Sequence, residues 1–212
     1  MNQRPVPDVV VRRLTQYYHA LRYCRDRGLE IISSQTLGEM LNVTAAQIRK
    51  DLSFFGGFGK QGIGYNVANL LEHLQRILGL QRMWNMALIG LGNLGRALLH
   101  YQGFAQEGFQ VVVLFDSDPR KIGTTVSGLT IHDDRDVGRI IPEMGIRIAL
   151  LAIPPEKAQE VTDMLVQAGV RAILNYAPVT LKVPEGVWVR QVDPLAALQS
   201  MTYYLVMGGK DH

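Results

Sequence analysis

The chain has one cysteine among its 212 residues, Cys24, and this scarcity limits the chemistry that the fold can use. A disulfide within the chain is excluded, and a zinc site built from several cysteines is not expected. Cys24 lies in a predicted helix, where a small buried side chain is a better interpretation than a nucleophile. The sequence therefore predicts no metal site.

Long apolar runs and targeting signals are also missing. The sequence has no stretch of about 18 apolar residues, the length that a membrane-spanning helix requires. Its first residues, Met-Asn-Gln-Arg-Pro, lack the apolar centre of a signal peptide. Internal repeats and low-complexity segments are absent too. We therefore expect a soluble, cytoplasmic protein with no membrane partner, with room for one large domain or two modest ones.

The net charge of +3 is unevenly distributed along the chain. Residues 1–80 hold 10 Lys and Arg against 6 Asp and Glu, a balance of +4, whereas the remaining residues hold 12 against 13, a balance of −1. A basic N-terminal part joined to a near-neutral body favours a polyanionic partner, such as a nucleic acid, for that part.

The most specific pattern is a glycine-rich turn. An apolar run at residues 86–89 leads into Gly90-x-Gly92-x-x-Gly95, and helix-forming residues follow. At this spacing a strand turns tightly into a helix whose free N–H groups face a pyrophosphate. The pattern predicts a dinucleotide site formed by Gly90, Leu91, Gly92, Asn93, Leu94, Gly95 and Arg96.

A second apolar run ends in an acid, Asp116, which lies 21 residues after Gly95. A carboxylate at about this distance accepts hydrogen bonds from ribose hydroxyls. Because a carboxylate repels a 2′-phosphate, the cofactors predicted are NADH and NAD+ rather than their phosphorylated forms. Arg120 and Lys121 stand close by and are interpreted as solvated turn residues.

Apolar runs and helical segments alternate through the rest of the chain. Strands are predicted near residues 130–132, 147–153, 172–175 and 187–192, with helices from about 134 to 144 and 156 to 168. Such alternation indicates an α/β fold with a Rossmann-like parallel sheet and helices on both faces. A terminal helix, from Asp193 to about Met207, is rich in apolar residues.

The N-terminal part predicts a helix-turn-helix behind a first helix that starts near Asp8. A short helix at 35–41 follows the candidate cap Ser34, and a second helix begins at Thr44 after a tight turn. Polar positions on that second helix can reach base edges and phosphates. DNA contacts are predicted at Ser34, Thr44, Ala45, Gln47, Arg49, Lys50 and Ser53.

Residues 56–65 hold five glycines in ten positions. A hairpin wing beside the second helix explains them best, because its tight turns would approach a phosphate backbone. A flexible linker is the simpler alternative, and a second phosphate loop is less favoured because no strand precedes Gly56. The wing would contact DNA through Phe58, Gly59, Lys60, Gln61, Gly64 and Tyr65.

Together these residues resemble the Rex family of redox-sensing transcriptional repressors over essentially the whole chain. The resemblance is most specific in four stretches: residues 48–56, the wing through Tyr65, Gly90 to Leu98, and Ile173-Leu-Asn-Tyr-Ala-Pro178. It implies a homodimer with winged helices on double-stranded operator DNA and Rossmann domains that sense the NADH/NAD+ ratio. It also implies that NADH binding releases the operator, and that the regulated genes serve respiration or fermentation.

The resemblance further implies a domain-swapped C-terminal helix, here Asp193 to about Met207. Tyr101 matches a family tyrosine near the nicotinamide, and Asp193 matches an acid that changes partners between the two states. The family often has Leu or Phe after that acid, whereas this chain has Pro194. The expected domains are 1–80 for DNA, 81–192 for NAD(H), and 193–212 for dimerisation.

An apolar nicotinamide pocket is expected at Ala152, Ile153 and Pro154, where it would favour neutral NADH over the cationic ring. An NAD-dependent dehydrogenase or a CoA-binding enzyme is the main alternative, since this fold hosts many chemistries. A dehydrogenase needs a proton-transfer residue beside the nicotinamide, yet neither His100 nor His132 sits at a predicted strand C-terminus in a catalytic motif. A third possibility is a DNA-binding protein whose Rossmann domain is only a dimer scaffold.

Overall fold

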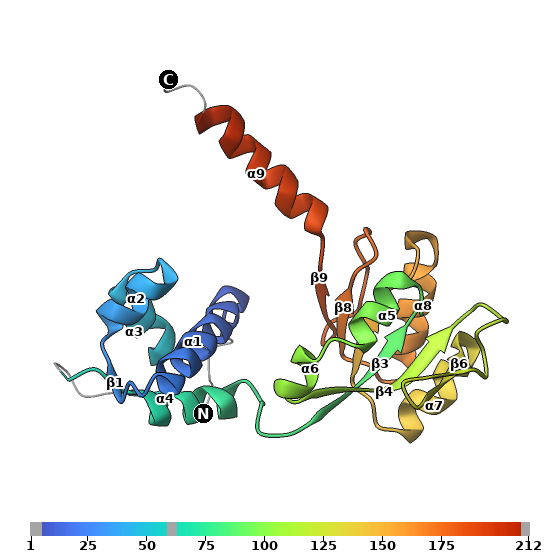
Figure 1. The fold of residues 1–212 in the computed structure, drawn as a ribbon, viewed down its shortest axis with the longest axis horizontal. Coiled ribbons are helices and arrows are strands. Elements are labelled where there is room, and N and C mark those ends of the chain that lie inside the picture. The colour runs from blue at the N-terminus through green and yellow to red at the C-terminus, as the bar shows by residue number, and fades with distance from the viewer. Residues whose placement is uncertain (1–5, 59–62, 209–212) are drawn as a thin grey trace. The chain divides into compact units, whose positions relative to one another are not determined.

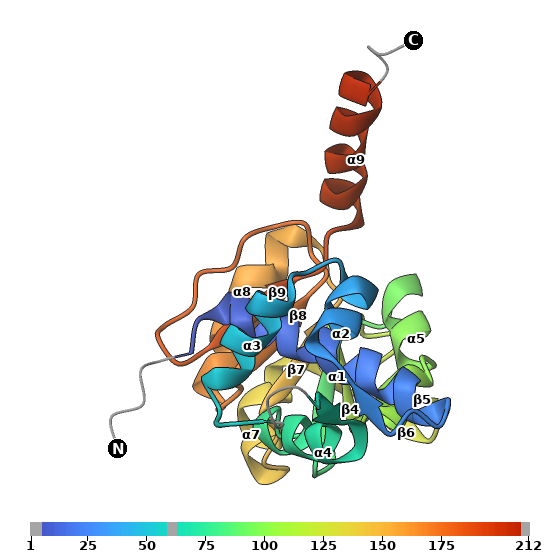
Figure 2. The same cartoon turned by 90° about the vertical axis from the view of Figure 1, so that its left-hand side faces the viewer.

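The computed structural model describes residues 6–58 and 63–208, which form two compact units, one ending at Arg82 and one starting at Met83. Figure 1 and Figure 2 show the elements of both. The elements of the N-terminal unit are α1 (Asp8–Asp26), β1 (Ile31–Ile32), α2 (Ser34–Leu41), α3 (Ala45–Ser53), β2 (Tyr65–Asn66) and α4 (Val67–Ile77).

The core of the N-terminal unit is built on helical periodicity. Leu14, Tyr17 and Leu21 are spaced three or four residues apart on α1 and are fully buried. They share one cluster with Leu37 of α2 and Leu74 of α4. Residues at this spacing lie on one face of a helix, so α1 packs its apolar face against the helix-turn-helix and α4.

Side-chain caps fix where α2 and α3 begin. The Ser33 hydroxyl accepts the N–H of Thr36 at 2.9 Å, so Ser33 is the cap of α2 and the predicted cap, Ser34, is the first helical residue. Serine is a favoured capping residue, so the sequence could not decide between the two consecutive serines, and the cap is Ser33. The Thr44 hydroxyl accepts the N–H of Gln47 at 3.1 Å, which confirms the predicted cap of α3.

A two-stranded antiparallel sheet closes the N-terminal unit. Ile31 pairs with Asn66, and Ile32 pairs with Tyr65. The predicted hairpin placed both strands within residues 56–65, whereas the described partner of Tyr65 comes from the segment before α2, and residues 56–58 are not in a strand. Gly64 has φ +93°, and a Cβ there would lie 2.7 Å from the Ile32 carbonyl oxygen. This contact explains why a glycine precedes β2.

The C-terminal unit contains a larger sheet. Among the described residues it has seven strands in the order β5-β6-β4-β3-β7-β8-β9. All pairs are parallel except β5 with β6. The strands are β3 (Trp84–Ile89), β4 (Phe109–Asp116), β5 (Thr125–Val126), β6 (Leu129–Asp133), β7 (Ile148–Leu151), β8 (Ala172–Asn175) and β9 (Trp188–Gln191).

Helices cover both faces of this sheet (Figure 1). They are α5 (Asn93–Leu99), α6 (Gly103–Gln106), η1 (Asp134–Asp136), α7 (Val137–Glu143) and α8 (Pro155–Gln167), whereas α9 (Pro194–Gly208) covers neither face. Ile141 of α7 and Val161 of α8 belong to one core cluster. Leu98 of α5 and Phe104 of α6 belong to another, which lies on the opposite side of the strands.

The order of the parallel strands determines where a ligand can bind. Numbered along the chain, the six parallel strands have the order 3-2-1-4-5-6 of a dinucleotide-binding sheet. The order reverses between β3 and β7, and ligands of such sheets bind beyond the carboxyl ends of the strands at that point. Gly90 follows β3 and Ala152 follows β7, so the predicted site lies at the reversal.

The terminal helix α9 is apolar and exposed. Every residue from Pro194 to Met207 is exposed, including Leu198 and Leu205. Within residues 6–58 and 63–208, no helix is long and apolar enough to cross a membrane.

Candidate functional site

Two glycines of the turn after β3 are required by contacts with backbone atoms. Gly90 has φ +92°, and a Cβ there would lie 2.4 Å from the Ala152 carbonyl oxygen. A Cβ on Gly95 would lie 1.8 Å from the Gly90 carbonyl oxygen. No side chain fits at either position, so these glycines allow the strand, the turn and α5 to pack against one another.

Gly92 differs from Gly90 and Gly95 because it faces open space. A Cβ there would meet no atom within 4 Å, and φ is −73°, a value open to any residue. Gly92 precedes α5 and provides no side-chain cap, so the first N–H groups of the helix are left to another acceptor. Asn93, Leu94 and Arg96 are exposed around it. The local fold does not require Gly92, which leaves its surface accessible to a ligand.

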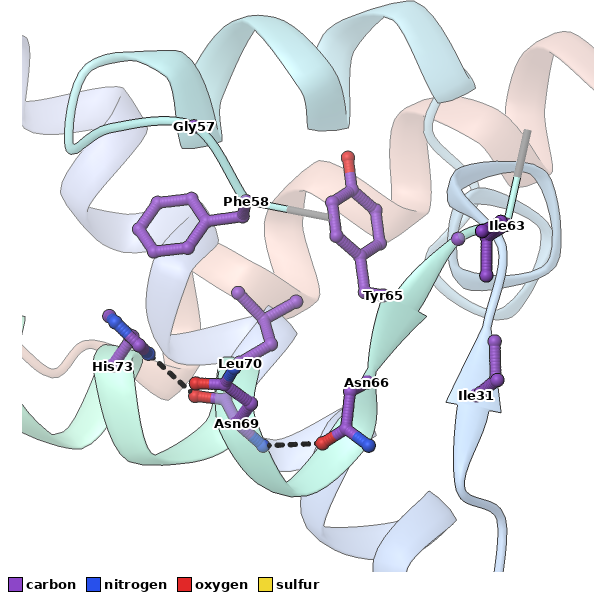
Figure 3. A pocket seen from close by; sticks show the side chains of 10 residues that line it. Ile31, Gly57, Phe58, Ile63, Tyr65, Asn66, Asn69, Leu70 and His73 are labelled. Atoms are coloured by element: carbon purple, nitrogen blue, oxygen red, sulfur yellow. Dashed lines mark hydrogen bonds between the residues drawn. The ribbon is translucent and has the colours of Figure 1, made fainter. Parts of the chain in front are cut away.

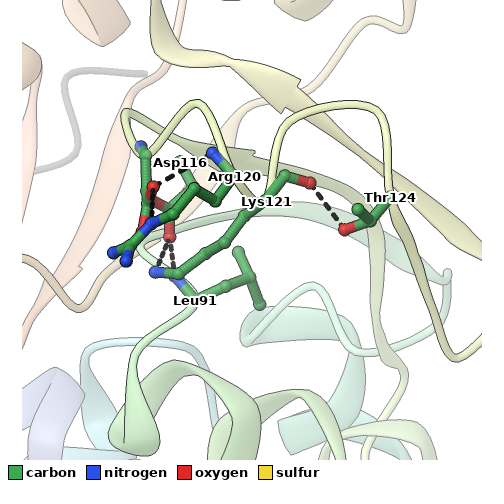
Figure 4. Close-up of polar contacts among 6 residues, drawn as sticks. Leu91, Asp116, Arg120, Lys121 and Thr124 are labelled. Atoms are coloured by element: carbon green, nitrogen blue, oxygen red, sulfur yellow. Dashed lines mark hydrogen bonds and ion pairs between the residues drawn. The ribbon is translucent and has the colours of Figure 1, made fainter.

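Asp116 connects the end of β4 to the glycine turn (Figure 4). Its Oδ2 accepts the N–H of Leu91 at 2.8 Å, and its Oδ1 accepts the N–H of Asp118 at 2.9 Å. Leu91 itself is buried, so its backbone rather than its side chain serves this site. The carboxylate therefore fixes the turn as well as standing where a ribose is expected.

Lys121 does not follow its sequence interpretation. Its Nζ donates to Asp116 Oδ2 at 2.8 Å, and its side chain is only 28% exposed, so it is paired rather than solvated. Arg120 is 89% exposed and pairs with Asp118. Burial alone would raise the pKa of Asp116, but the bonds from Lys121, Asp118 and Leu91 lower it below its ordinary value. Asp116 is therefore charged and partly neutralised.

The residues after β7 and α5 are expected to line the other end of the binding crevice. β7 ends at Leu151 and not at Ile153 as predicted. Ala152 and Ile153 therefore lie in the connection that follows the strand, where they are half-buried, and Pro154 is exposed. Tyr101 follows α5 and is 60% exposed, with its ring edge-on to that of Phe104 at 5.0 Å between centroids. This end offers an aromatic ring and apolar surface.

In the described part of the N-terminal unit, Asp51 of α3 is a buried side chain that accepts four hydrogen bonds, and sequence reasoning missed it. It is fully buried and accepts two hydrogen bonds from Arg13, at 2.6 and 2.8 Å. The Tyr17 hydroxyl and the Gln47 amide each add one at 2.7 Å. Burial would raise the pKa of Asp51, but these bonds lower it below its ordinary value. The network holds α3 against α1.

A signal for Asp51 was present in the sequence. Asp51 stands between Ile48 and Leu52 on the apolar face of α3. An acid at such a position needs buried partners, and Arg13 on α1 lies 38 residues away in sequence. Because the pairing is long-range, helix periodicity could indicate that a partner exists but could not name it.

The exposed side of α3 contains most of the predicted DNA contacts. Arg49, Lys50 and Ser53 are exposed, while Ala45 and Gln47 are half-buried. Arg49 donates to the Ser34 hydroxyl at 2.8 Å, so both predicted contacts lie on one surface of α2 and α3. Gln47 donates one amide proton to Asp51, which fixes how its side chain is presented.

The described part of the predicted wing borders a cavity of about 480 Å³ (Figure 3). Phe58 packs edge-on against His73 of α4, with 5.3 Å between the ring centroids. Gly64 and Tyr65 line the other side. Three predicted contacts, Gly59, Lys60 and Gln61, lie outside the described residues.

Asp193 begins the terminal helix. Its Oδ1 accepts the N–H groups of Leu195 and Ala196 at 3.0 and 3.1 Å, so it caps α9. Asp193 is exposed, and its predicted role as a switch remains a prediction. In the described ranges, no three His, Cys, Asp or Glu side chains cluster as metal ligands would.

Comparisons with known proteins cover both units. The family of CoA binding domains matches residues 81–179, and the family described as the N-terminus of putative DNA-binding proteins matches residues 5–53. The redox-sensing transcriptional repressor Rex of Roseiflexus sp. (strain RS-1) is 59% identical over 199 residues, which cover 94% of this chain and 90% of the relative.

The chain belongs to the Rex family of redox-sensing transcriptional repressors. This membership confirms the resemblance seen in the sequence and decides between an enzyme and a regulator, because the Rex relatives are repressors.

Solved structures of RSP, a Rex-family repressor, match nearly the full length. RSP in complex with beta-NAD+ and operator DNA is 38% identical with a TM-score of 0.90, covering 99% of this chain and 100% of RSP. RSP in complex with beta-NADH is 38% identical with a TM-score of 0.87, covering 97% of both chains. The fold of this Rex-family chain is therefore the predicted one.

Proposed function

We propose that this chain is a cytoplasmic, homodimeric repressor that binds double-stranded operator DNA and senses the NADH/NAD+ ratio. NADH binding to the Rossmann unit releases the operator and so regulates genes of respiration and fermentation. The observation that carries this proposal is the glycine turn at the reversal of strand order, where a dinucleotide crevice is expected, with Gly90, Gly95 and Asp116 in place, on the same chain as a helix-turn-helix. RSP, similar over its whole length, has been solved with both kinds of ligand.

The crevice fits a dinucleotide at three points. The turn around Gly92 gives a pyrophosphate access to backbone N–H groups at the start of α5. Asp116 presents a charged carboxylate to the ribose, and among the described residues its Oδ1 accepts one hydrogen bond, from the Asp118 N–H, which leaves an acceptor position for a ribose hydroxyl. Tyr101, Ala152, Ile153 and Pro154 provide the surface for the nicotinamide. We assign these residues, with Leu91, Asn93, Leu94 and Arg96, to cofactor binding.

Discrimination between the two redox forms follows from charge. When bound, NADH supplies a neutral nicotinamide ring and NAD+ a cationic one. Half-buried Ala152 and Ile153 solvate a cation poorly, so this end of the crevice favours the neutral ring. A ligand shifts an equilibrium only by its difference in affinity for the two states. Moving a population from 99:1 to 1:99 takes about 5.5 kcal/mol, which two sites on a dimer can share.

On the DNA side, α3 is the recognition helix. Ala45 and Gln47 approach base edges, while Arg49, Lys50 and Ser53 reach phosphates or bases. Ser34, which is bonded to Arg49, and Thr44, at the start of α3, contact the DNA as well, as do the described wing residues Phe58, Gly64 and Tyr65. Dimerisation uses residues 193–212, because the exposed apolar side chains of α9 need a partner surface. The remaining boundaries are 1–80 for DNA and 81–192 for NAD(H).

The test is a titration of labelled operator DNA with the protein at fixed salt, alone and with saturating NADH or NAD+. We expect NADH to weaken operator binding by at least about tenfold and NAD+ to leave it nearly unchanged. If neither nucleotide changes operator binding although both bind, the Rossmann unit is a scaffold and the sensor function is wrong. Turnover of NADH with small carbonyl substrates would instead indicate a dehydrogenase.

A further inference from the structure

The sequence stretch Ile173 to Pro178 has no role in the site described so far, yet it contains a fully buried amide, Asn175. Asn175 is the last residue of β8 and stands in register with Gln191, the last residue of β9. A buried amide costs free energy unless its donors and acceptor are satisfied. The partners of Asn175 therefore show what this position does.

Every group of the Asn175 side chain is bonded. Its Oδ1 accepts the N–H of Ala177 at 2.9 Å. Its Nδ2 donates to the Val179 carbonyl at 2.9 Å and to Gln191 Oε1 at 2.7 Å. Gln191 in turn donates from Nε2 to the Ala177 carbonyl at 2.6 Å. Two side chains thus hold the loop after β8 and the end of β9 together; we call them the amide clamp.

One end of the amide clamp lies beside the nicotinamide end of the crevice. The N–H of Tyr176 donates to the Leu151 carbonyl at 2.9 Å, one residue before Ala152. The Tyr176 ring packs in the same cluster as Ala152 and Leu98. Burial raises the pKa of Tyr176, and the nearby Tyr101 hydroxyl raises it further, so the two tyrosines share one region.

The other end of the amide clamp leads directly to α9. The N–H of Val192 donates to the Asn175 carbonyl at 2.8 Å, and the next residue, Asp193, caps α9 through its carboxylate. Between the cap and Gln191 there is one residue. A displacement of the loop at Tyr176 would therefore move Gln191 and the start of α9 with it.

We propose that Asn175 and Gln191 are positioning residues that transmit the state of the nicotinamide pocket to α9. They touch neither nucleotide nor DNA; they make the loop after β8 and the start of α9 move as one piece. This inference rests on the proposed sensor function. It predicts that the clamp can be cut without loss of either binding activity, and that only the coupling between the two is lost.

The experiment uses the full chain and compares Gln191→Ala with Gln159→Ala. Gln159 is a matched control because its amide also donates and accepts hydrogen bonds that hold this connection, here with the carbonyl and the N–H of Lys182, each at 2.9 Å. Lys182 lies in the same connection between β8 and β9. Three quantities are measured for each protein: NADH affinity by calorimetry, operator affinity without nucleotide, and operator affinity with saturating NADH.

For Gln191→Ala we expect NADH affinity and nucleotide-free operator affinity within about threefold of the unmodified chain, with the NADH effect on operator binding reduced by at least about tenfold. Gln159→Ala should keep the full effect. Hydrogen exchange provides a structural readout: NADH should slow exchange at the Val192 amide in the unmodified chain and not in Gln191→Ala.

Several results would overturn the proposal. A full NADH effect in Gln191→Ala removes the clamp from the coupling, and loss of NADH binding places Gln191 in the pocket or the fold. An equal loss of the NADH effect in Gln191→Ala and Gln159→Ala shows that any weakening of the connection between β8 and β9 has this result. If Gln191→Ala does not fold, Gln191→Glu keeps the acceptor for Asn175 and lacks the donor to Ala177, and the same outcomes apply. An unmodified chain that ignores NADH refutes the sensor function itself.

Discussion

Each unit contains a buried aspartate near its proposed binding surface, and the two are held in different ways. Asp51 of α3 is bonded only by side chains, those of Arg13, Tyr17 and Gln47. Asp116 at the end of β4 is bonded by two backbone N–H groups and one lysine. Asp51 is 0% exposed and Asp116 is 7% exposed.

This difference separates a carboxylate that holds a fold from one that can exchange a partner. Four donors occupy both oxygens of Asp51, two on each, so no acceptor position is left for a ligand. Within the described ranges, Lys121 is the one side-chain partner of Asp116, and a lysine ammonium on its flexible four-carbon stem can move aside. We therefore expect Asp51 to contribute to stability and Asp116 to contribute mainly to nucleotide affinity.

The largest effect is expected from Asp51→Ala. The change leaves the Arg13 guanidinium, 20% exposed, and the buried Tyr17 hydroxyl without their acceptor. Removing one partner of a buried ion pair costs about 3–5 kcal/mol, here from the unfolding free energy of the N-terminal unit. Urea unfolding followed by circular dichroism measures it. Asp26→Ala, which removes an exposed pair with Arg25, is the control; equal effects of the two variants would contradict the comparison.

Asp116→Ala is expected to reduce NADH affinity by about ten- to hundredfold, because the ribose loses a charged acceptor and Leu91 loses its anchor. Calorimetric titration with NADH measures the change. Operator binding without nucleotide should remain, since Asp116 belongs to the other unit. A variant that binds NADH as tightly as the unmodified chain would remove Asp116 from the site.

Acid should reduce the contribution of both aspartates to folding stability, in the same pH range. The pKa of each is lower in the folded protein than its ordinary value of 3.8, so the folded state binds fewer protons than the unfolded chain there. The stability from each group is complete above about pH 4 and is lost as pH falls through the folded pKa. Unfolding of the unmodified chain, Asp51→Asn and Asp116→Asn from pH 7 downward measures this. The difference in unfolding free energy between the unmodified chain and each variant should become smaller only below about pH 4. A difference that stays constant down to lower pH would contradict the lowered pKa of that aspartate.

The smallest effect is expected from Lys121→Met. The substitution removes the positive charge that pairs with Asp116 and leaves the negative charge of the carboxylate uncompensated. NADH affinity should change by less than about threefold, because the N–H groups of Leu91 and Asp118 still hold the carboxylate in place, while discrimination against NADPH should widen. Parallel titrations with NADH and NADPH measure both. A loss of NADH affinity as large as that of Asp116→Ala would show that Lys121 itself binds the nucleotide.

Local patterns in the sequence predicted the parts of the molecule that local forces determine. The Gly90 turn, the acid at the end of β4 and the cap at Thr44 follow from local spacing and residue type, and the structure has them in place. Family resemblance supplied what spacing could not, namely the regulatory function.

Long-range pairings could not be read from the sequence. No residue near Arg13 in the sequence indicates its pairing with Asp51. In the same way, no residue near Ile31 indicates that it pairs with Asn66. Lys121 was misread although its partner, Asp116, lies only five residues earlier, because the pairing depends on how the turn between them folds back. Partners chosen by tertiary packing leave only weak traces in the local pattern.

Cys24 has a practical consequence. It is 4% exposed, its sulfur lies 3.8 Å from that of Met40, and burial raises the pKa of its thiol. Thiolates are the species that react with peroxides and maleimides, so this thiol is chemically quiet. A protein that reads redox state from a nucleotide is thereby insulated from direct oxidation at cysteine. Ser200→Cys, on the exposed surface of α9, would give one fast-reacting thiol for a fluorescent dye, with no native cysteine to remove first.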